Sequence, residues 1–149
     1  LGEEDVRLGT VESEDALFGG ISAEGQIGDF KIYNNKAQFI IQSNRISSYY
    51  IPYGGGILDA DIVRPEGAEG RDVIDEHTFM AGLGRILRPT SFEILSDGSD
   101  GLAHLRVMGE GALYRCRRRR MVSDSSSSGI NNSYLSSFGT LFQKSGVLI

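Results

Sequence analysis

Two short runs of alternating apolar and polar residues, separated by Asn34–Asn35, most restrict what this chain can fold into. The run 30–33 (FKIY) precedes the asparagines and the run 37–42 (AQFIIQ) follows them. Alternation places successive side chains on opposite faces of a strand, and asparagine tolerates the positive φ of tight turns. The pattern predicts a β-hairpin whose second strand has Ala37, Phe39 and Ile41 on one face and Gln38 and Gln42 on the other.

A second hairpin is predicted further along the chain. Residues 91–95 (SFEIL) and 102–108 (LAHLRVM) flank the turn-forming sequence DGSDG at 97–101, and Ala103, Leu105 and Val107 would share one face. Strand–turn units of this kind, with 20 glycines in the chain and no long helical periodicity, favour a mainly β fold. We expect an antiparallel β-sandwich, complete or partial, followed by a flexible C-terminal tail.

Charge divides the chain into unequal parts. Residues 1–110 carry 19 acidic and 9 basic side chains, whereas residues 111–149 carry 1 and 6. We therefore expect an acidic lead-in over residues 1–18, a β-sandwich-like domain over 19–112 and a basic, serine-rich tail over 113–149. A basic block followed by serines is typical of a solvated, disordered segment. The alternative for 113–149 is an artefact of a truncated or out-of-frame gene end.

The basic block itself suggests two kinds of chemistry, and neither is favoured. Arg117 to Arg120 could contact nucleic acid, but no helix-turn-helix, zinc-finger or aromatic stacking motif accompanies them and the rest of the chain is acidic. Cys116 is the single cysteine, and neighbouring arginines could lower the pKa of its thiol. A lone cysteine is more commonly a small buried hydrophobe than a nucleophile.

Three tyrosines and two aspartates are the candidate ligand-binding residues. Tyr49, Tyr50 and Tyr53 could stack on a sugar ring, or could cover one end of the core. Asp59 and Asp61 would lie on the same face of a strand over 57–63. A calcium site there is conceivable, but the spacing does not match an EF-hand loop, so we expect solvated surface carboxylates.

The glycine run Gly54–Gly55–Gly56 invites comparison with a phosphate-binding loop. The Gly-Lys-Ser/Thr sequence that completes such a loop is missing. We expect these glycines to let the backbone bend or pass close to another strand. No catalytic, metal-binding or cofactor-binding constellation is predicted, so the sequence favours a protein that is not an enzyme.

Several stretches together resemble a recurring N-terminal region of large, uncharacterised secreted or lipid-anchored bacterial proteins. They are GQIGDFKIYNNKAQFIIQ, YGGGILDADIVRP, GRDVIDE and EILSDGSDGLAHLRVMGEG, and the resemblance covers about residues 19–112. More loosely, the chain is similar to the opening strands of galactose-mutarotase-like β-supersandwiches. The first resemblance implies an extracellular or periplasmic β module, and the second a sugar-associated sandwich, with no catalytic residue to carry over.

These observations lead to two functional hypotheses. The first is a non-catalytic structural or interaction module of a larger exported protein, with other domains of that protein as partners. The alternative is a carbohydrate-associated binding domain that uses the tyrosines and aspartates named above. Nucleic acid is a less favoured partner, and no apolar run approaches the roughly 18–20 residues that cross a bilayer.

Overall fold

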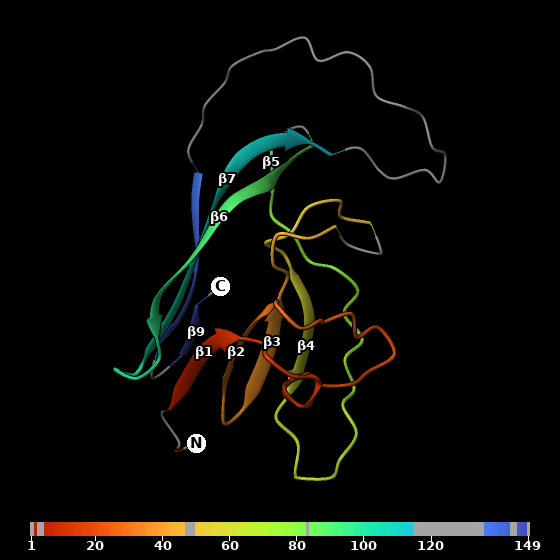
Figure 1. Ribbon diagram of the computed structural model, residues 1–149, viewed down its shortest axis with the longest axis vertical. Coiled ribbons are helices and arrows are strands. Elements are labelled where there is room, and N and C mark those ends of the chain that lie inside the picture. The colour runs from red at the N-terminus through yellow and green to blue at the C-terminus, as the bar shows by residue number, and fades with distance from the viewer. Residues whose placement is uncertain are drawn as a thin grey trace.

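The protein consists of two antiparallel β-sheets that share one hydrophobic core. The structure is a computed structural model that describes residues 2, 5–46, 50–82, 84–114, 136–143 and 146–148. Figure 1 shows the four strands of the first sheet beside a long, curved hairpin that belongs to the second. The predicted β class and its antiparallel pairing are confirmed.

The first sheet has the strand order β1-β2-β3-β4. Its strands are β1 (Val6–Thr10), β2 (Phe30–Asn34), β3 (Ala37–Ile41) and β4 (Ile57–Ile62). The predicted hairpin is confirmed, because β2 pairs antiparallel with β3 in a register that sets Ile32 opposite Phe39.

Asn34 closes the turn of this hairpin. Its side-chain Oδ1 accepts hydrogen bonds from the backbone N–H groups of Lys36 and Ala37, both at 2.8 Å. This is the local bonding that makes asparagine a turn residue.

The second sheet has the order β5-β6-β7-β8-β9. The second predicted hairpin is confirmed and extends beyond its predicted ends, because its strands are β6 (Arg85–Asp97) and β7 (Leu102–Leu113). The remaining strands are β5 (Met80–Ala81), β8 (Ser136–Gln143) and β9 (Gly146–Leu148). Strands β8 and β9 lie within the segment 113–149 expected as a tail, and β8 pairs with β7.

The core lies between the two sheets. Phe30 of β2 stacks on Phe92 of β6, with ring centroids 5.3 Å apart. The predicted apolar face of the second hairpin is part of this core. The buried side chains of the core are Val6, Leu8, Ile32, Ile41, Ala103, Leu105 and Val107.

The opposite face of the first sheet is also covered. Ile40 is fully buried, although it lies on the side of β3 away from Ile41. A Cβ added to Gly25 would come 3.2 Å from the Ile40 side chain, so the segment before β2 crosses this face. Gln42, expected on a polar face, is buried as well.

The acidic segment 1–18, expected as a lead-in, contributes to the packed structure. It contains edge strand β1, whose Val6 and Leu8 belong to the core, and a short 3-10 helix over Glu14–Ala16. Arg7 fastens β1 to the β6–β7 turn, because its Nη1 donates to the carbonyl of Gly98 at 3.0 Å. Within the described residues, no helix is long and apolar enough to cross a membrane.

Replacing Gly98 with alanine should destabilise the protein more than the same change at Gly28. Both glycines have positive φ, 96° and 94°, which costs an L-residue roughly 1–2 kcal/mol. A Cβ at Gly98 would also clash with the carbonyl oxygen of Val6, whereas nothing lies within 4 Å at Gly28. We expect G98A to lose about 1–3 kcal/mol more unfolding free energy than G28A in denaturant titrations. Equal losses would show that β1 does not hold this turn closely.

Candidate functional site

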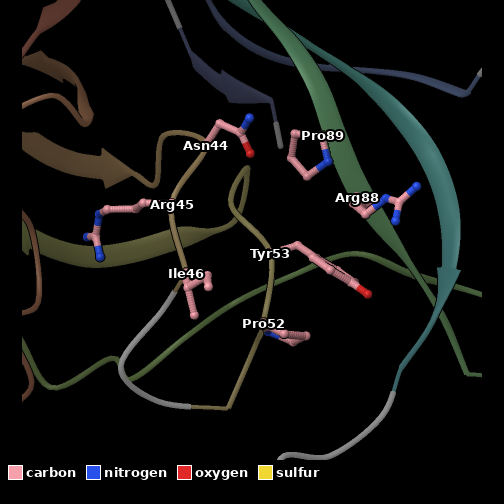
Figure 2. A pocket seen from close by; sticks show the side chains of 7 residues that line it. All are labelled: Asn44, Arg45, Ile46, Pro52, Tyr53, Arg88 and Pro89. Atoms are coloured by element: carbon pink, nitrogen blue, oxygen red, sulfur yellow. The ribbon is translucent and has the colours of Figure 1, made fainter. Parts of the chain in front are cut away.

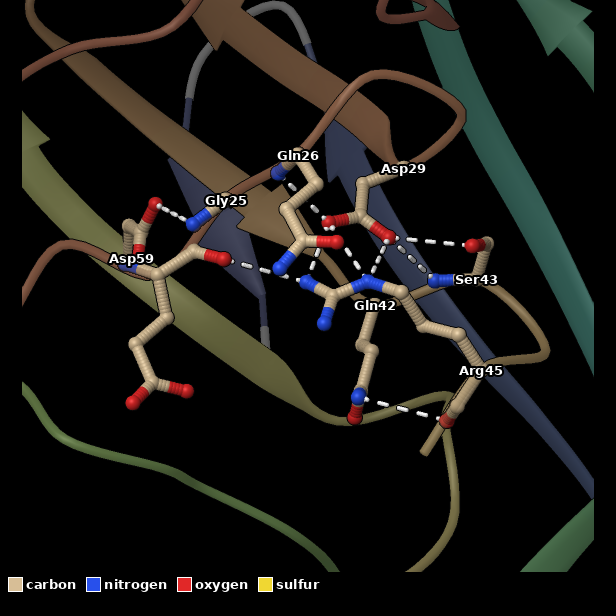
Figure 3. Close-up of polar contacts among 8 residues, drawn as sticks. Gly25, Gln26, Asp29, Gln42, Ser43, Arg45 and Asp59 are labelled. Atoms are coloured by element: carbon tan, nitrogen blue, oxygen red, sulfur yellow. Dashed lines mark hydrogen bonds and ion pairs between the residues drawn. The ribbon is translucent and has the colours of Figure 1, made fainter. Parts of the chain in front are cut away.

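A buried carboxylate, that of Asp29, organises one end of the first sheet. Asp29 is 0% exposed. Its oxygens accept hydrogen bonds from the backbone N–H of Gln26 at 2.9 Å and from the N–H and hydroxyl of Ser43 at 2.9 and 3.0 Å. The guanidinium of Arg45 adds an ion pair with an Nη2–Oδ2 distance of 2.6 Å (Figure 3).

These contacts keep Asp29 ionised. Burial alone would raise the pKa of Asp29, because it penalises the charged form. The hydrogen bonds from Arg45, Ser43 and Gln26 outweigh burial and leave the pKa below its ordinary value of 3.8. The ion pair therefore persists at neutral pH and fixes the segment that follows β3.

The segment after β3 is fastened to the glycine run as well. Gln42 donates its backbone N–H to the carbonyl of Gly56 and accepts one from Gly55, at 2.9 and 2.8 Å. A Cβ at Gly54 would clash with the carbonyl of Ser43. The predicted role of these glycines, a close passage of two backbones, is confirmed.

A cleft of about 450 Å³ opens between this fixed segment and strand β6. Its volume lies in the range of small-molecule sites, about 300–1,000 Å³. One side comes from the connection between β3 and β4, and the other from β6 (Figure 2). The lining residues are Asn44, Arg45, Ile46, Pro52, Tyr53, Arg88 and Pro89.

The cleft combines apolar surfaces with a few polar groups. The Tyr53 ring, Pro52 and Pro89 supply flat or rigid surfaces, and Asn44 supplies an amide. Arg45 contributes its stem, because its side chain extends away from Tyr53 in Figure 2 and ends on Asp29.

Arg88 is the cationic group at the rim of the cleft. It pairs with Glu110 at 2.8 Å, but both side chains are more than half exposed. Exposed pairs of this kind are worth about 0–1 kcal/mol. The guanidinium of Arg88 can therefore exchange this partner for a ligand at little cost.

The structure brings one of the predicted site residues into the cleft. Tyr53 lines it, whereas Tyr50 is exposed and does not belong to the lining set. Tyr49 lies outside the described residues. Asp59 and Asp61 lie on β4, and neither contributes to the lining.

The expectation that Asp59 is a solvated surface carboxylate is wrong. Asp59 is 0% exposed, and its two oxygens accept the backbone N–H groups of Glu24 and Gly25, both at 2.8 Å. The chain before β2 crosses this face of β4 and encloses the carboxylate. Burial raises the pKa of Asp59; the two N–H donors oppose this, and the nearby charge of Asp72 adds to the increase.

The same expectation for Asp61 is also wrong, because only 4% of its side chain is exposed. It pairs with Arg64 at 2.7 Å and accepts the backbone N–H of Arg71 at 2.8 Å. The hydrogen bond and charge of Arg64 hold the pKa of Asp61 below its ordinary value, although burial opposes this. Both aspartates therefore serve the local structure of β4 and the loops that cover it.

Among the residues that the structure describes, no group of three or more His, Cys, Asp or Glu side chains could hold a metal ion. Cys116 and the arginines at 115 and 117–120 lie outside these residues.

Comparison of the chain with models of known families, with curated proteins and with solved structures found no match.

The Asp29–Arg45 pair should be a main determinant of stability at the cleft. Removing one partner of a buried ion pair costs about 3–5 kcal/mol, and the partly exposed Arg45 places Asp29→Asn at the lower end, about 3 kcal/mol. The control E110Q breaks the exposed pair and should cost less than about 1 kcal/mol. Chemical denaturation of the three proteins at neutral pH measures both values, and similar costs would contradict the structural role of Asp29.

The same pair should make stability depend on pH in acid. The pKa of Asp29 is lowered on folding, so its contribution is present above the unfolded-state pKa and is lost as pH falls through the folded-state pKa. The difference in unfolding free energy between the parent protein and D29N should therefore shrink below about pH 4. A difference that stays constant down to pH 2–3 would argue against an ionised Asp29.

Proposed function

We propose that this chain is a non-catalytic interaction module of a larger exported protein and that it binds its ligand in the cleft between the β3–β4 connection and β6. The observation that carries this proposal is the cleft itself, in which Tyr53 lies among proline and isoleucine surfaces. A mainly apolar concavity with a few convergent polar groups is the usual form of a binding site.

The buried acids support a structural rather than a chemical role. Asp29 and Asp59 each have both carboxylate oxygens engaged by backbone or arginine N–H groups. A general acid or base must reach the proton that it transfers. These carboxylates face the interior of the protein, where they hold loops in place.

A carbohydrate is the ligand class that the lining favours. Tyrosine presents a flat apolar ring with a polar hydroxyl, and the two prolines extend this surface without adding donors. The amide of Asn44 can donate hydrogen bonds to sugar hydroxyls and accept them, and the guanidinium of Arg88 can donate them. The sequence-based alternative, a carbohydrate-associated domain, thus receives support from the place of Tyr53.

The exported location belongs to the proposal. It rests on the resemblance to secreted and lipid-anchored proteins, and partner domains of such a protein could occupy the same cleft. A sugar and a partner domain make different demands, because a domain interface needs about 800 Å² on each side, whereas a sugar ring needs the tyrosine surface.

Tyr53→Ala should abolish or strongly weaken sugar binding. The test is an NMR titration of the ¹⁵N-labelled protein with a panel of neutral and acidic mono- and oligosaccharides at millimolar concentration. We expect shifts to concentrate on Asn44, Ile46 and Tyr53, with an affinity loss of about tenfold or more in Y53A, as for the removal of a stacking aromatic worth about 0.5–1.5 kcal/mol beyond its buried area.

Tyr50→Ala is the matched control, since Tyr50 is an exposed tyrosine close in sequence that does not line the cleft. Y50A should bind as the parent protein does. Equal effects of the two substitutions, or shifts confined to residues far from the cleft, would contradict the proposed site. Sugars that cause no shift at all would leave a protein partner as the ligand to be sought.

A further inference from the structure

The side of the cleft that carries Tyr53 depends on a second carboxylate, that of Glu76. One oxygen of Glu76, Oε2, accepts the backbone N–H of Tyr50 at 2.7 Å and that of Ile51 at 2.6 Å. Bonds of this length to an ionised acceptor are among the stronger hydrogen bonds in proteins. They join two segments that are 25–26 positions apart in the chain.

These two bonds are well placed to position the wall of the cleft. Tyr50 and Ile51 immediately precede Pro52 and Tyr53, which line the cleft. Pro52 has no N–H to donate, so Tyr50 and Ile51 carry the last donors before it. The loop is then held at its far end by the bonds between Gly55, Gly56 and Gln42.

The backbone next to Glu76 is fixed to strand β4 by hydrogen bonds. The next residue, His77, exchanges two backbone hydrogen bonds with Ile57 of β4, at 2.8 and 2.9 Å. The carboxylate of Glu76 therefore connects the edge of the first sheet to the loop that carries Tyr53.

The environments of Glu76 and Asp29 differ in their effect on ionisation. Burial raises the pKa of Glu76; the two backbone donors oppose this, and the negative charges of Glu24 and Asp75 add to the increase. Both acids are close enough for their charges to act on the carboxylate of Glu76. The pKa of Glu76 is thus above its ordinary value of 4.5, whereas that of Asp29 is below its own.

We propose that Glu76 is a positioning residue for residues 50–53, the Tyr53 wall of the cleft. Its protonation loosens this wall, while residues 43–45, the Arg45 wall, stay fixed. A neutral carboxyl group is a weaker acceptor than a carboxylate, so residues 50–53 gain freedom when Glu76 takes up a proton. At the pH at which Glu76 takes up its proton, Asp29 is still ionised, because its pKa is lowered. Asp29 therefore keeps Ser43 and Arg45 in place. The consequence for ligand affinity rests on the proposed function of the cleft, but the response of the loop to pH does not.

Protonation of Glu76 is not expected to unfold the domain. Because the pKa of Glu76 is raised on folding, the folded state binds this proton more tightly than the unfolded state does. Its contribution to stability is complete below the unfolded-state pKa and is lost as pH rises through the folded-state pKa. The acid form is thus a folded protein with a looser cleft, distinct from the acid destabilisation that Asp29 brings at lower pH.

The test follows backbone amide shifts of the ¹⁵N-labelled full chain by NMR between about pH 3 and pH 7, where carboxyl groups titrate. We expect the Tyr50 and Ile51 amides to move together, with a midpoint above 4.5, the ordinary value for glutamate. The Gln26 and Ser43 amides, which donate to Asp29, should move only at lower pH and serve as the internal reference.

Glu76→Gln separates the charge from the hydrogen bonds. Its amide oxygen can accept both N–H groups, so E76Q should fold and give Tyr50 and Ile51 amides that hardly change over the same pH range. Glu76→Ala removes the acceptor, and hydrogen exchange at these two amides should become at least about tenfold faster at neutral pH. Asp75→Asn is the matched control: it removes a repelling charge and should lower the midpoint while keeping exchange slow.

The proposal is overturned if the Tyr50 and Ile51 amides titrate in E76Q as in the parent protein, or if they show no transition in the parent protein. Unfolding of E76A would leave E76Q and D75N to decide the matter. None of these measurements uses a ligand. A cleft that binds no sugar would therefore refute the proposed ligand class and leave the role of Glu76 unaffected. Tyr50 and Ile51 amides that do not respond to Glu76 would refute its positioning role and leave the proposed ligand class unaffected.

Discussion

The ionised, buried carboxylate of Asp29 is the interaction on which the cleft-bearing part of the molecule depends. A charge removed from water must be compensated by donors of its own, and here the donors come from the turn before β2 and from the segment after β3. Meeting this requirement fixes both pieces of backbone together. The carboxylate thus turns two irregular stretches into a stable support for Asn44 and Ile46.

The parts of the fold that follow from short-range pattern were predictable. The Asn34 turn and the DGSDG turn each contain the bonding groups that close them, so both hairpins could be inferred from a few consecutive residues. Asp59 could not be placed in this way. Its donors, Glu24 and Gly25, are 34–35 positions away, and a local pattern carries no information on which loop will cover an exposed-looking strand.

The residues of the cleft likewise divide into one that the local sequence could indicate and others that depend on contacts between distant segments. Tyr53 could be proposed because a tyrosine-rich stretch before a glycine run is visible in the sequence. Arg88 and Pro89 come from a different sheet, and Arg45 lines the cleft only because its guanidinium is tied to Asp29. Each of these depends on the packing of the two sheets. The wall that comes from the β3–β4 connection is an irregular segment held by carboxylates, and in such a region local opening costs less than global unfolding.

The attachment of β1 bears on the order in which the molecule assembles. Its link to the β6–β7 turn, from Arg7 to Gly98, spans 91 positions of the chain, whereas the two hairpins need only short loops to close. Because a long loop must lose much of its entropy before such a contact forms, the hairpins are expected early and the contact between Arg7 and Gly98 late, whereas β1 reaches β2 across the short segment 11–29. The first sheet can therefore form from consecutive segments of the chain, while its attachment to the second sheet through Arg7 must wait until the β6–β7 turn has been synthesised.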